Sequence, residues 1–390
     1  MRFMQDTLQH TLQDFTDLIL HANQSGQPLR LRGGGTKDFL GQSLQGEVLD
    51  TRAYSGILSY EPSELVITVR AGTPLAEVEA VLAEKGQSFA FEPPHFGDGA
   101  TIGGMVAAGL AGPSRASVGS VRDFVLGARV INGKGEHLTF GGQVMKNVAG
   151  YDVSRLLAGS WGQLGLITEV SLKVLPVAPG EATLVCAGLS QAQALKLINQ
   201  WGGQPLPLNA SAWVYDTTAN PAQDFFFVRL RGAVAAVDAA VTKMSADVQV
   251  LGAQVTRMDS ADVAADWKAS GEQTLDFFKA PSDHDCLWRL SVPQTAPVLH
   301  VNVNGKACAQ YIEWHGAQRW LWAPASAAAQ VRDAAVKAGG HATLFRASSA
   351  HSEADKQVGV YTPLNAVQQR IQNELKKQFD PAGIFNPSRI

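Results

Sequence analysis

The first thirty residues carry apolar side chains at the spacing of a helix. The apolar residues of this stretch recur every three to four positions and are Leu8, Leu12, Phe15, Leu18 and Ile19. Such spacing places them on one helical face. Gly26 and Pro28 follow, and both residue types end helices. Residues 29–32 then predict a short strand that leads directly into a glycine-rich turn.

Shorter apolar runs with turn residues between them predict strands in the next 140 residues. These runs lie at residues 48–51, 57–60, 65–70, 124–131, 136–140 and 170–174. Between the third and fourth run, Thr73 is placed to cap a helix that starts at Pro74 and ends before Gly86. Asn132-Gly133 favours positive φ and predicts a hairpin between the fourth and fifth runs. The pattern is typical of an α+β domain.

The composition changes after Gly180, where we expect a second domain to begin. Alanine-rich helical stretches at residues 191–200, 233–246 and 325–338 alternate there with strand-like runs such as 225–230. Three tryptophans within nine residues are typical of a core or an interface and hint at a subunit contact; they are Trp314, Trp320 and Trp322. The last predicted helix has one apolar face, formed by Leu364, Val367, Ile371, Leu375 and Phe379.

Composition and charge narrow the classes of protein. With 390 residues, 45% of them hydrophobic, the chain predicts two or three domains. Its 32 basic and 35 acidic residues lack the basic excess expected of a nucleic-acid-binding protein. Three cysteines without a CxxC pair predict a reducing compartment and no iron–sulfur or zinc-thiolate site. Because we find neither a signal peptide nor an apolar run of membrane-spanning length, we expect a cytoplasmic protein.

Three glycine-rich turns point to a large phosphate-bearing cofactor. They are Arg32-Gly-Gly-Gly-Thr36, Thr101-Ile-Gly-Gly104 and Gly159-Ser-Trp-Gly-Gln-Leu-Gly165. Glycine lets backbone amides approach a phosphate closely, and successive N–H groups form an anion-binding nest. The chain contains neither GxGxxG nor a complete P-loop. A simple Rossmann or P-loop site is therefore not expected.

Four segments of the chain, in order, resemble one flavoprotein family. They are RGGGT at 32–36, EPPHFGDGATIGGMVAAGLAGPSRASVGSVRDFVLG at 92–127, MKNVAGYDVSRLLAGSWGQLG at 145–165 and FDPAGIFNPSRI at 379–390. They resemble the vanillyl-alcohol oxidase and p-cresol methylhydroxylase (PCMH) superfamily and, within it, the FAD-binding E subunits of bacterial glycolate oxidases. The resemblance implies an α+β fold with a two-part PCMH-type FAD-binding domain at 1–178. It also implies an α+β cap or substrate domain at 179–363, with a C-terminal helix and tail at 364–390 packing back on the FAD domain.

The same resemblance implies which residues surround the FAD. The first loop would donate hydrogen bonds to the pyrophosphate, the second turn would approach from the other side, and four residues between 114 and 120 would line the flavin. The residues implied are Arg32, Gly33, Gly34, Gly35, Thr36, Lys37, Pro94, Thr101, Ile102, Gly103, Gly104, Gly109, Ser114, Ser117, Gly119, Ser120, Lys146, Gly162, Gly165, Ile167 and Asn386.

The chain departs from the family pattern at two places. Relatives with a covalent flavin often carry a histidine near the first loop, where this chain has Thr36 and Lys37. We therefore expect non-covalent FAD. The tail reads Asn-Pro-Ser-Arg where many relatives have Asn-Pro-Gly-Arg, so we expect that Ser388 does not need a positive φ.

Oxidation of a 2-hydroxy acid needs a base for the hydroxyl proton and a cation for the carboxylate. Arginine suits the carboxylate because its guanidinium binds with two parallel hydrogen bonds. Arg289, Arg319 and Arg346 are the candidates, and an internal carboxylate partner is the alternative for each. His341 is the candidate base, and a local hydrogen bond at a strand start is its alternative. The nine histidines show no ligand spacing, so we expect no metal.

The resemblance implies an FAD-binding subunit of a glycolate oxidase (glycolate dehydrogenase) complex, which oxidises glycolate to glyoxylate. It implies two partners, a second FAD-containing subunit and an iron–sulfur subunit, with contact to the inner membrane only through the complex. Two alternatives stay open. One is a stand-alone FAD-dependent dehydrogenase of another 2-hydroxy acid such as lactate. The other is a non-catalytic flavin-bearing assembly subunit.

Overall fold

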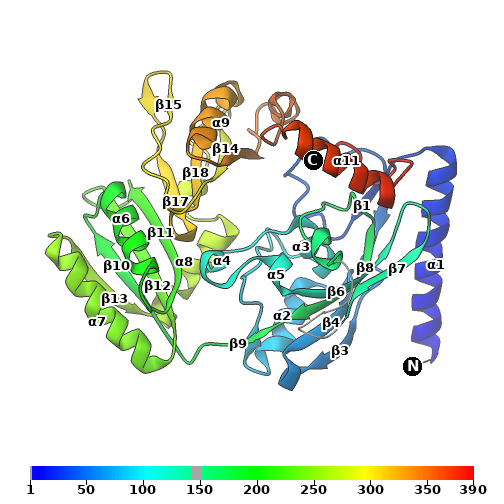
Figure 1. Cartoon of the computed structure of the whole chain (residues 1–390), viewed down its shortest axis with the longest axis horizontal. Coiled ribbons are helices and arrows are strands. Elements are labelled where there is room, and N and C mark those ends of the chain that lie inside the picture. The colour runs from blue at the N-terminus through cyan, green and yellow to red at the C-terminus, as the bar shows by residue number, and fades with distance from the viewer. Residues whose placement is uncertain (1, 143–151) are drawn as a thin grey trace. The chain divides into compact units, whose positions relative to one another are not determined.

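The computed structural model describes residues 2–142 and 152–390, which form two compact units (Figure 1). Unit 1 comprises Met1–Ala111, Ser120–Val177 and Pro363–Ile390, and unit 2 comprises Gly112–Gly119 and Ala178–Thr362. The chain therefore leaves unit 1 for eight residues before it returns to complete the first sheet. The sequence pattern gave no sign of this excursion.

Unit 1 is built on a five-stranded antiparallel sheet in the order β3-β4-β8-β6-β7. Its strands are β3 (Ile57–Glu61), β4 (Val66–Arg70), β8 (Leu166–Lys173), β6 (Val125–Ile131) and β7 (His137–Gly141). Two small pairs accompany it, namely β1 (Leu29–Arg32) with β2 (Glu47–Asp50), and β5 (Gln87–Ser88) with β9 (Leu175–Pro176). The helices are α1 (Arg2–Ser25), α2 (Leu75–Ala83), α3 (Ile102–Ala108), α5 (Val121–Phe124) and α11 (Ala366–Phe379). The strands expected from the apolar runs are confirmed.

Two predicted turn details differ in the structure. Helix α2 begins at Leu75 with Pro74 as its cap, so the predicted cap at Thr73 is wrong by one residue. The Thr73 hydroxyl instead donates to the carbonyl of Arg70 and accepts from the amide of Gly56. The hairpin between β6 and β7 is confirmed, but its positive φ lies at Gly135. The Asn132 side chain shapes this turn by accepting from two backbone amides.

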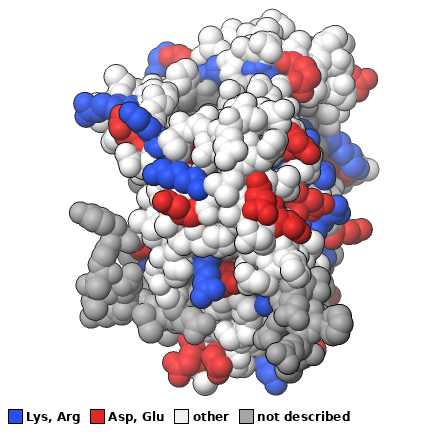
Figure 2. All heavy atoms as spheres, turned by 90° about the vertical axis from the view of Figure 1, so that its right-hand side faces the viewer, with Lys and Arg blue, Asp and Glu red and all other residues white. Residues whose placement is uncertain are grey.

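Helix α1 packs on unit 1 through most of the face that the sequence predicted, but Leu18, which was assigned to that face, is 44% exposed. Phe15, Ile19 and Ala22 are buried in a cluster with residues of β1, β2 and the C-terminal tail. Ile384 and Phe385 supply the tail's part of that cluster. Because burial of each large apolar side chain contributes roughly 1.5–3 kcal/mol, both ends of the chain stabilise the β1 region. On the face seen in Figure 2, basic and acidic side chains lie interspersed.

Unit 2 is built on an eight-stranded antiparallel sheet in the order β13-β10-β12-β11-β17-β18-β14-β19. Its strands are β10 (Gly180–Ala187), β11 (Leu208–Asp216), β12 (Gln223–Gly232), β13 (Gln254–Asp259), β14 (Cys286–Ser291), β17 (Gln310–Glu313), β18 (Gln318–Ala323) and β19 (His341–Arg346). A small hairpin joins β15 (Asn302–Val303) to β16 (Lys306–Ala307). The helices are α4 (Arg115–Val118), α6 (Gln191–Gly202), α7 (Val234–Val250), α8 (Ser260–Glu272), α9 (Ala328–Lys337) and α10 (Ser352–Asp355).

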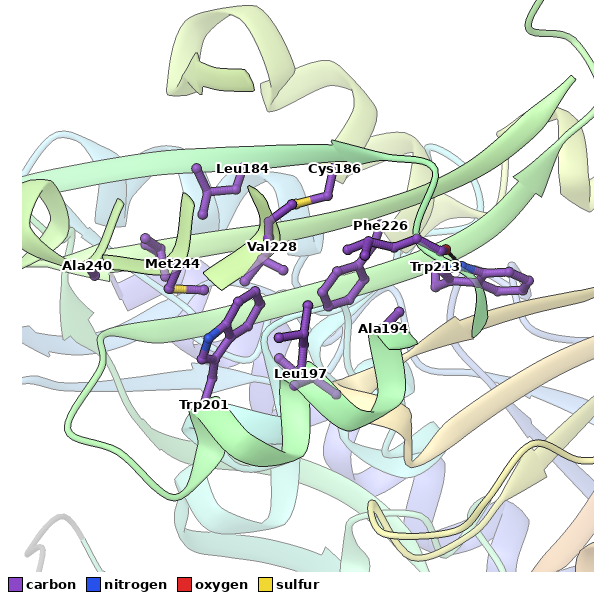
Figure 3. Packing of buried hydrophobic residues seen from close by; sticks show 14 of the residues in the cluster. Leu184, Cys186, Ala194, Leu197, Trp201, Trp213, Phe226, Val228, Ala240 and Met244 are labelled. Carbon is purple, nitrogen blue, oxygen red and sulfur yellow. Dashed lines mark hydrogen bonds between the residues drawn. The ribbon is translucent and has the colours of Figure 1, made fainter. Parts of the chain in front are cut away.

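Two apolar clusters hold helices on this sheet. In the first, Ala194, Leu197 and Trp201 of α6 point toward residues of β10 and β12, and Met244 of α7 joins them (Figure 3). In the second, Trp288 and Leu290 of β14 pack with side chains of α9. The helical stretches expected near residues 191, 233 and 325 are therefore confirmed, and their apolar faces are buried.

The tryptophans of residues 314–322 lie inside unit 2. Trp320 is 3% exposed and packs edge-on against Phe278 and Phe345. Trp314 is 7% exposed, and its indole N–H donates to the carbonyl of Gly112. The hint of a subunit contact is therefore wrong for these two residues, because their rings fill the interior of their own unit.

The last helix, α11, makes less contact than its apolar face predicted. Val367 and Ile371 are more than half exposed, and none of the helix's residues is buried. The Phe379 ring approaches Phe140, with 6.0 Å between the ring centroids. The Asn365 side chain caps the helix by accepting from two amides. Contact with the rest of unit 1 is therefore concentrated at the helix's C-terminal end.

The tail after α11 contains a backbone conformation that the sequence did not predict. Ser388 has φ of 58° and Asn386 has φ of 39°. The expectation that position 388 avoids positive φ is therefore wrong. A serine here is held in the left-handed region that glycine adopts most easily, because the neighbouring Arg389 is fixed by several hydrogen bonds.

The strain at Ser388 gives a first prediction. The Ser388→Gly substitution removes the Cβ atom that disfavours positive φ, so it should raise the free energy of unfolding by about 1 kcal/mol. Urea denaturation of the purified chain measures this. Ser388→Ala is the matched control, because alanine keeps the Cβ atom. An equal gain from both substitutions would contradict the explanation.

Candidate functional site

The first glycine turn leaves its backbone donors available. Among the described residues, no group accepts a hydrogen bond from the amides of Gly34, Gly35 or Thr36. All three residues are only half-buried. Consecutive unpaired N–H groups in such a turn form a nest that binds anions such as phosphate. The turn that the sequence singled out therefore has the donors for that ligand class.

Steric contacts explain why this turn needs glycine. A Cβ atom added at Gly34 would overlap the carbonyl group of Gly99 on the opposite loop. Gly35 has φ of 73°, where a side chain is strained, and a Cβ atom there would also meet the Arg32 guanidinium. Without side chains, the loop lies directly against residues 99–101. The close approach holds the nest in place.

Cationic side chains surround the nest. The Asp38 carboxylate pairs with Arg30 and, at 2.8 Å, with Nε of Arg32. Lys37 is 8% exposed, and its ammonium donates to the carbonyl of His95 at 3.1 Å and to the Thr36 hydroxyl at 3.3 Å. Two arginines and a lysine next to one carboxylate leave the turn with a positive balance, which favours an anion.

The second glycine turn, at residues 101–104, borders the pocket without offering free amide donors at residues 102–104. Thr101 caps α3, and its hydroxyl accepts from the amide of Gly104 at 3.2 Å. The amides of Ile102 and Gly103 donate to the carbonyls of Thr73 and Ala71. All three amides at the start of α3 are therefore satisfied within the protein. Gly103 and Gly104 bring the helix close to the pocket because they lack side chains.

The C-terminal tail connects the first and third turns. The Asn386 carbonyl oxygen Oδ1 accepts from the amide of Leu31 at 2.9 Å, and Nδ2 donates to the carbonyl of Trp161 at 2.6 Å. The amide of Leu29 donates to Ile384, and the amide of Asn386 donates to Leu29. The tail thus runs beside β1 and fixes the strand from which the first turn emerges.

Asp380 anchors that tail. It is 2% exposed, and its carboxylate accepts from the amides of Ile384 at 3.0 Å and Phe385 at 2.8 Å. Burial raises the pKa of the Asp380 carboxyl, while these amide hydrogen bonds act in the opposite direction. The bonds fold the chain back after α11 and direct it toward β1.

A single pocket of unit 1 collects most of the predicted cofactor residues. The predicted residues that line it are Arg32, Gly33, Gly34, Gly35, Thr36, Lys37, Thr101, Gly103, Gly104, Gly162, Gly165, Ile167 and Asn386. Several lining residues were not predicted, and they include Arg30, Asp38, Ala71, Ala107, Trp161 and Arg389. Arg389 is 4% exposed, donates to the carbonyls of residues 37, 38 and 42, and stacks on Trp161. In the sequence, only the position of Arg389 within the family segment at 379–390 could have indicated this role.

Seven other predicted cofactor residues, all of them described, do not line this pocket. Pro94 and Ile102 are buried, and Gly109 ends α3 with φ of 64°. Ser120 caps α5 through Asp123. Three others belong to unit 2 and are Ser114, Ser117 and Gly119. Lys146 lies outside the described residues.

Ser117 has a defined partner within unit 2. Its hydroxyl lies 2.9 Å from Nε2 of His315, and the hydroxyl of Ser211 lies 3.0 Å from Nδ1 of the same ring. Burial lowers the pKa of His315 to about 4, so the ring is neutral near pH 7. Both ring nitrogens are thus engaged by serine hydroxyls.

The candidate catalytic residues of unit 2 lie on neighbouring strands. Ser291 pairs with His341 and Arg289 pairs with Thr343, so Arg289 and His341 are diagonal neighbours on one face of the sheet. Burial lowers the pKa of Arg289 to about 10. The pKa of His341 is also lowered, by burial and by the positive charge of Arg289. Arg346 ends the same strand as His341 and donates to the Gln273 side chain at 3.2 Å.

Arg319, a third candidate cation, has a structural role. Its side chain is fully buried and donates to the carbonyls of Gly316, Pro297 and Ala296 at 2.8–3.3 Å. Burial lowers its pKa to about 10, so it remains a cation near pH 7. Because these carbonyls occupy its guanidinium, Arg319 is not a carboxylate receptor for substrate.

The described residues lack two further features, a metal-binding cluster and a membrane-spanning helix. Residues 2–142 and 152–390 contain no cluster of three or more His, Cys, Asp or Glu side chains placed to hold a metal ion. Within the same residues, no helix has the length and apolar character needed to cross a membrane.

Sequence comparisons identify relatives over both units. A family described as "FAD binding domain" matches residues 8–141. The glycolate oxidase subunit GlcE of Escherichia coli K12 is 44% identical over 364 residues, which cover 93% of this chain and 92% of that protein. The glycolate oxidase subunit GlcD of Bacillus subtilis 168 is 32% identical over 160 residues, which cover 40% of this chain and 34% of that protein.

A structural comparison agrees on the fold. A 4-ethylphenol oxidase from Gulosibacter chungangensis superposes with a TM-score of 0.67 at 14% sequence identity, covering 97% of this chain and 87% of that one. At this identity, the likeness concerns the fold alone. The α+β fold expected from the sequence, with an FAD-binding domain of the PCMH type before a large antiparallel sheet, is confirmed.

The tail contact gives a second prediction. Asn386→Ala removes two hydrogen bonds that join the tail to Leu31 and Trp161, so it should lower the free energy of unfolding by about 1–3 kcal/mol. Urea denaturation measures the change. Asn373→Ala on the exposed side of α11 is the control and should change stability by less than about 0.5 kcal/mol. Equal effects would show that Asn386 does not link the turns.

Proposed function

The chain belongs to the family of the glycolate oxidase subunit GlcE, and from this we propose that it is the FAD-binding subunit of a glycolate oxidase complex. In that role it takes part in the oxidation of glycolate to glyoxylate. The observation that carries the proposal is the pocket of unit 1, whose donor-rich glycine turn is closed by the tail. The 44% identity over 93% of the chain supports the same function.

The residues of this pocket fit FAD. The amides of Gly34, Gly35 and Thr36 would donate to the pyrophosphate, and Lys37 and Arg32 would balance its charge. Gly103, Gly104 and Gly162 would allow the cofactor to lie close to the backbone. Bound FAD supplies the acceptor for the hydride that leaves the substrate's α-carbon. Because Thr36 and Lys37 stand where covalent relatives often have histidine, we propose that the FAD is not covalently attached.

Unit 2 would bind the substrate. In our proposal, Arg289 receives the substrate carboxylate, His341 accepts the proton of its hydroxyl group, and Arg346 adds positive charge at the end of the same strand. The lowered pKa of His341 supports the role of base, because it favours the neutral ring near pH 7. Placement of Arg289 and His341 on one sheet face supports joint action on one small acid.

The proposed complex would contain a second FAD subunit and an iron–sulfur subunit that passes electrons onward. The partial similarity to GlcD, itself a glycolate oxidase subunit by name, supports two related flavoproteins in one assembly. We propose a cytoplasmic location, with contact to the inner membrane through the partners. The rivals are a self-sufficient dehydrogenase of another 2-hydroxy acid such as lactate, and a flavin-bearing subunit without catalysis.

An anaerobic absorbance spectrum of the purified chain tests the proposed chemistry. The chain alone should show an oxidised flavin spectrum, and acid precipitation should release the flavin into the supernatant. Glycolate should bleach the flavin bands, while an equal concentration of lactate should bleach them more slowly. Bleaching by lactate alone would favour the first rival, and flavin that neither acid reduces would favour the second. A chain without flavin would refute the proposal.

The glycine turn gives a prediction for cofactor binding. Gly34→Ala places a methyl group against the Gly99 carbonyl, so the nest must shift and the purified protein should lose at least about tenfold in FAD affinity, or about 1.4 kcal/mol. Fluorescence titration of the apoprotein with FAD measures the loss. Gly202→Ala in α6, where added atoms meet nothing, should bind FAD normally. Normal FAD binding by Gly34→Ala would place the cofactor elsewhere.

A further inference from the structure

Arg289 is a partly buried cation without a direct counter-ion. Among the described residues, its guanidinium makes no hydrogen bond and no ion pair; its closest recorded contact is the Phe345 ring, 5.2 Å from the ring centroid. A cation–π contact offsets only about 0.5–2 kcal/mol. Partial burial of an unpaired charge also costs free energy, so an opposite charge nearby would stabilise Arg289.

The Glu313 carboxyl group acts electrostatically on Arg289. It is 5% exposed at the end of β17, and its Oε1 atom accepts from the indole N–H of Trp320 at 2.6 Å and from the Gln318 amide at 2.5 Å. Both donors hold the carboxyl group in one orientation. Burial raises the pKa of Glu313, and the positive charge of Arg289 acts to lower it.

Strand register places the two groups on the same face of the sheet. Glu313 pairs with Gln318, Gln318 pairs with Ser291, and Ser291 pairs with His341. These four residues form a row across four strands. In the adjacent row, Arg289 pairs with Trp320, the residue that donates to Glu313. Trp320 therefore lies between the cation and the carboxyl group.

Several other titratable groups lie near this pair, and one of them is His341, whose pKa is lowered by burial and by the charge of Arg289. Tyr361 and the cationic Arg115 on α4 act electrostatically on Arg289. Tyr311, which shares β17 with Glu313, is buried and bonded to Ser270 at 2.8 Å. His315 follows Glu313 in the chain, and its ring stays neutral between Ser117 and Ser211. Among these groups, Glu313 is the carboxyl group that acts on Arg289.

We propose that Glu313 is the positioning residue of Arg289, and that binding of a small carboxylate to Arg289 replaces Glu313 as counter-ion and makes Glu313 take up a proton. This inference rests on the proposed role of Arg289 in substrate binding. The ligand places a second negative charge near a buried carboxyl group, which disfavours the ionised form of Glu313. The proton comes from solvent, and no covalent bond changes. Carboxylate affinity therefore rises as the pH falls through the range in which Glu313 titrates.

Calorimetry of the oxidised, FAD-loaded chain with glyoxylate tests the proposal. Glyoxylate is the product of the proposed reaction and carries the same carboxylate as the substrate. Titrations near pH 7 in buffers of different ionisation enthalpy measure protons taken up for each ligand bound. The wild-type chain should take up a fraction of a proton, and Glu313→Gln should bind glyoxylate with that uptake lost. Glu181→Gln, a glutamate of the same unit that pairs with Arg231, should keep the uptake.

A second variant tests the idea without altering the carboxyl group. Trp320→Phe removes one donor to Glu313, which disfavours the carboxylate and moves the pH of maximal uptake upward. Wild-type binding without proton uptake, or uptake that persists in Glu313→Gln, would overturn the proposal. If glyoxylate does not bind the wild-type chain, the role of Arg289 and this inference are both wrong. FAD binding and flavin bleaching test the proposed function separately.

Discussion

The structure of the pocket of unit 1 depends on hydrogen bonds between the C-terminal tail and β1. Asn386 joins Leu31 to Trp161, and Asp380 folds the chain so that its next residues can run beside the strand. The glycine turn after β1 has few bonds of its own, because no described group accepts a hydrogen bond from the amides of Gly34, Gly35 or Thr36. A turn that keeps its donors free needs support from outside, and the tail provides that support.

Local patterns predicted most elements but few of the longer-range contacts. The period of α1 and the hairpin around Asn132 depend on neighbours a few residues apart, so the sequence was sufficient to find them. The positive φ at Ser388 is imposed by bonds from Arg389 to a distant loop, and no local signal reveals it. For the same reason, the burial of Trp314 and Trp320 was missed: it depends on packing partners distant in the chain.

The candidate site shows the same division. Residues 33–36 were predicted as a binding turn because three consecutive glycines rarely serve another structural purpose. All four residues line the pocket. Arg30 and Asp38 were not predicted as pocket residues, because an arginine and an aspartate in sequence look the same whether they form an ordinary surface ion pair or line a pocket. In unit 2, three arginines looked alike in sequence. The structure separates them: carbonyl oxygens surround Arg319, Gln273 binds Arg346, and Arg289 faces an aromatic ring.

The long separation between Leu31 and Asn386 also has a consequence for the order of folding. These residues are 355 positions apart, and the chain is synthesised from its N-terminus at roughly 5–20 residues per second. The first glycine turn therefore emerges from the ribosome well before the segment that fixes it. Final assembly of the pocket has to wait for residues 380–389, so stable capture of a ligand there comes only after this distant segment has been synthesised.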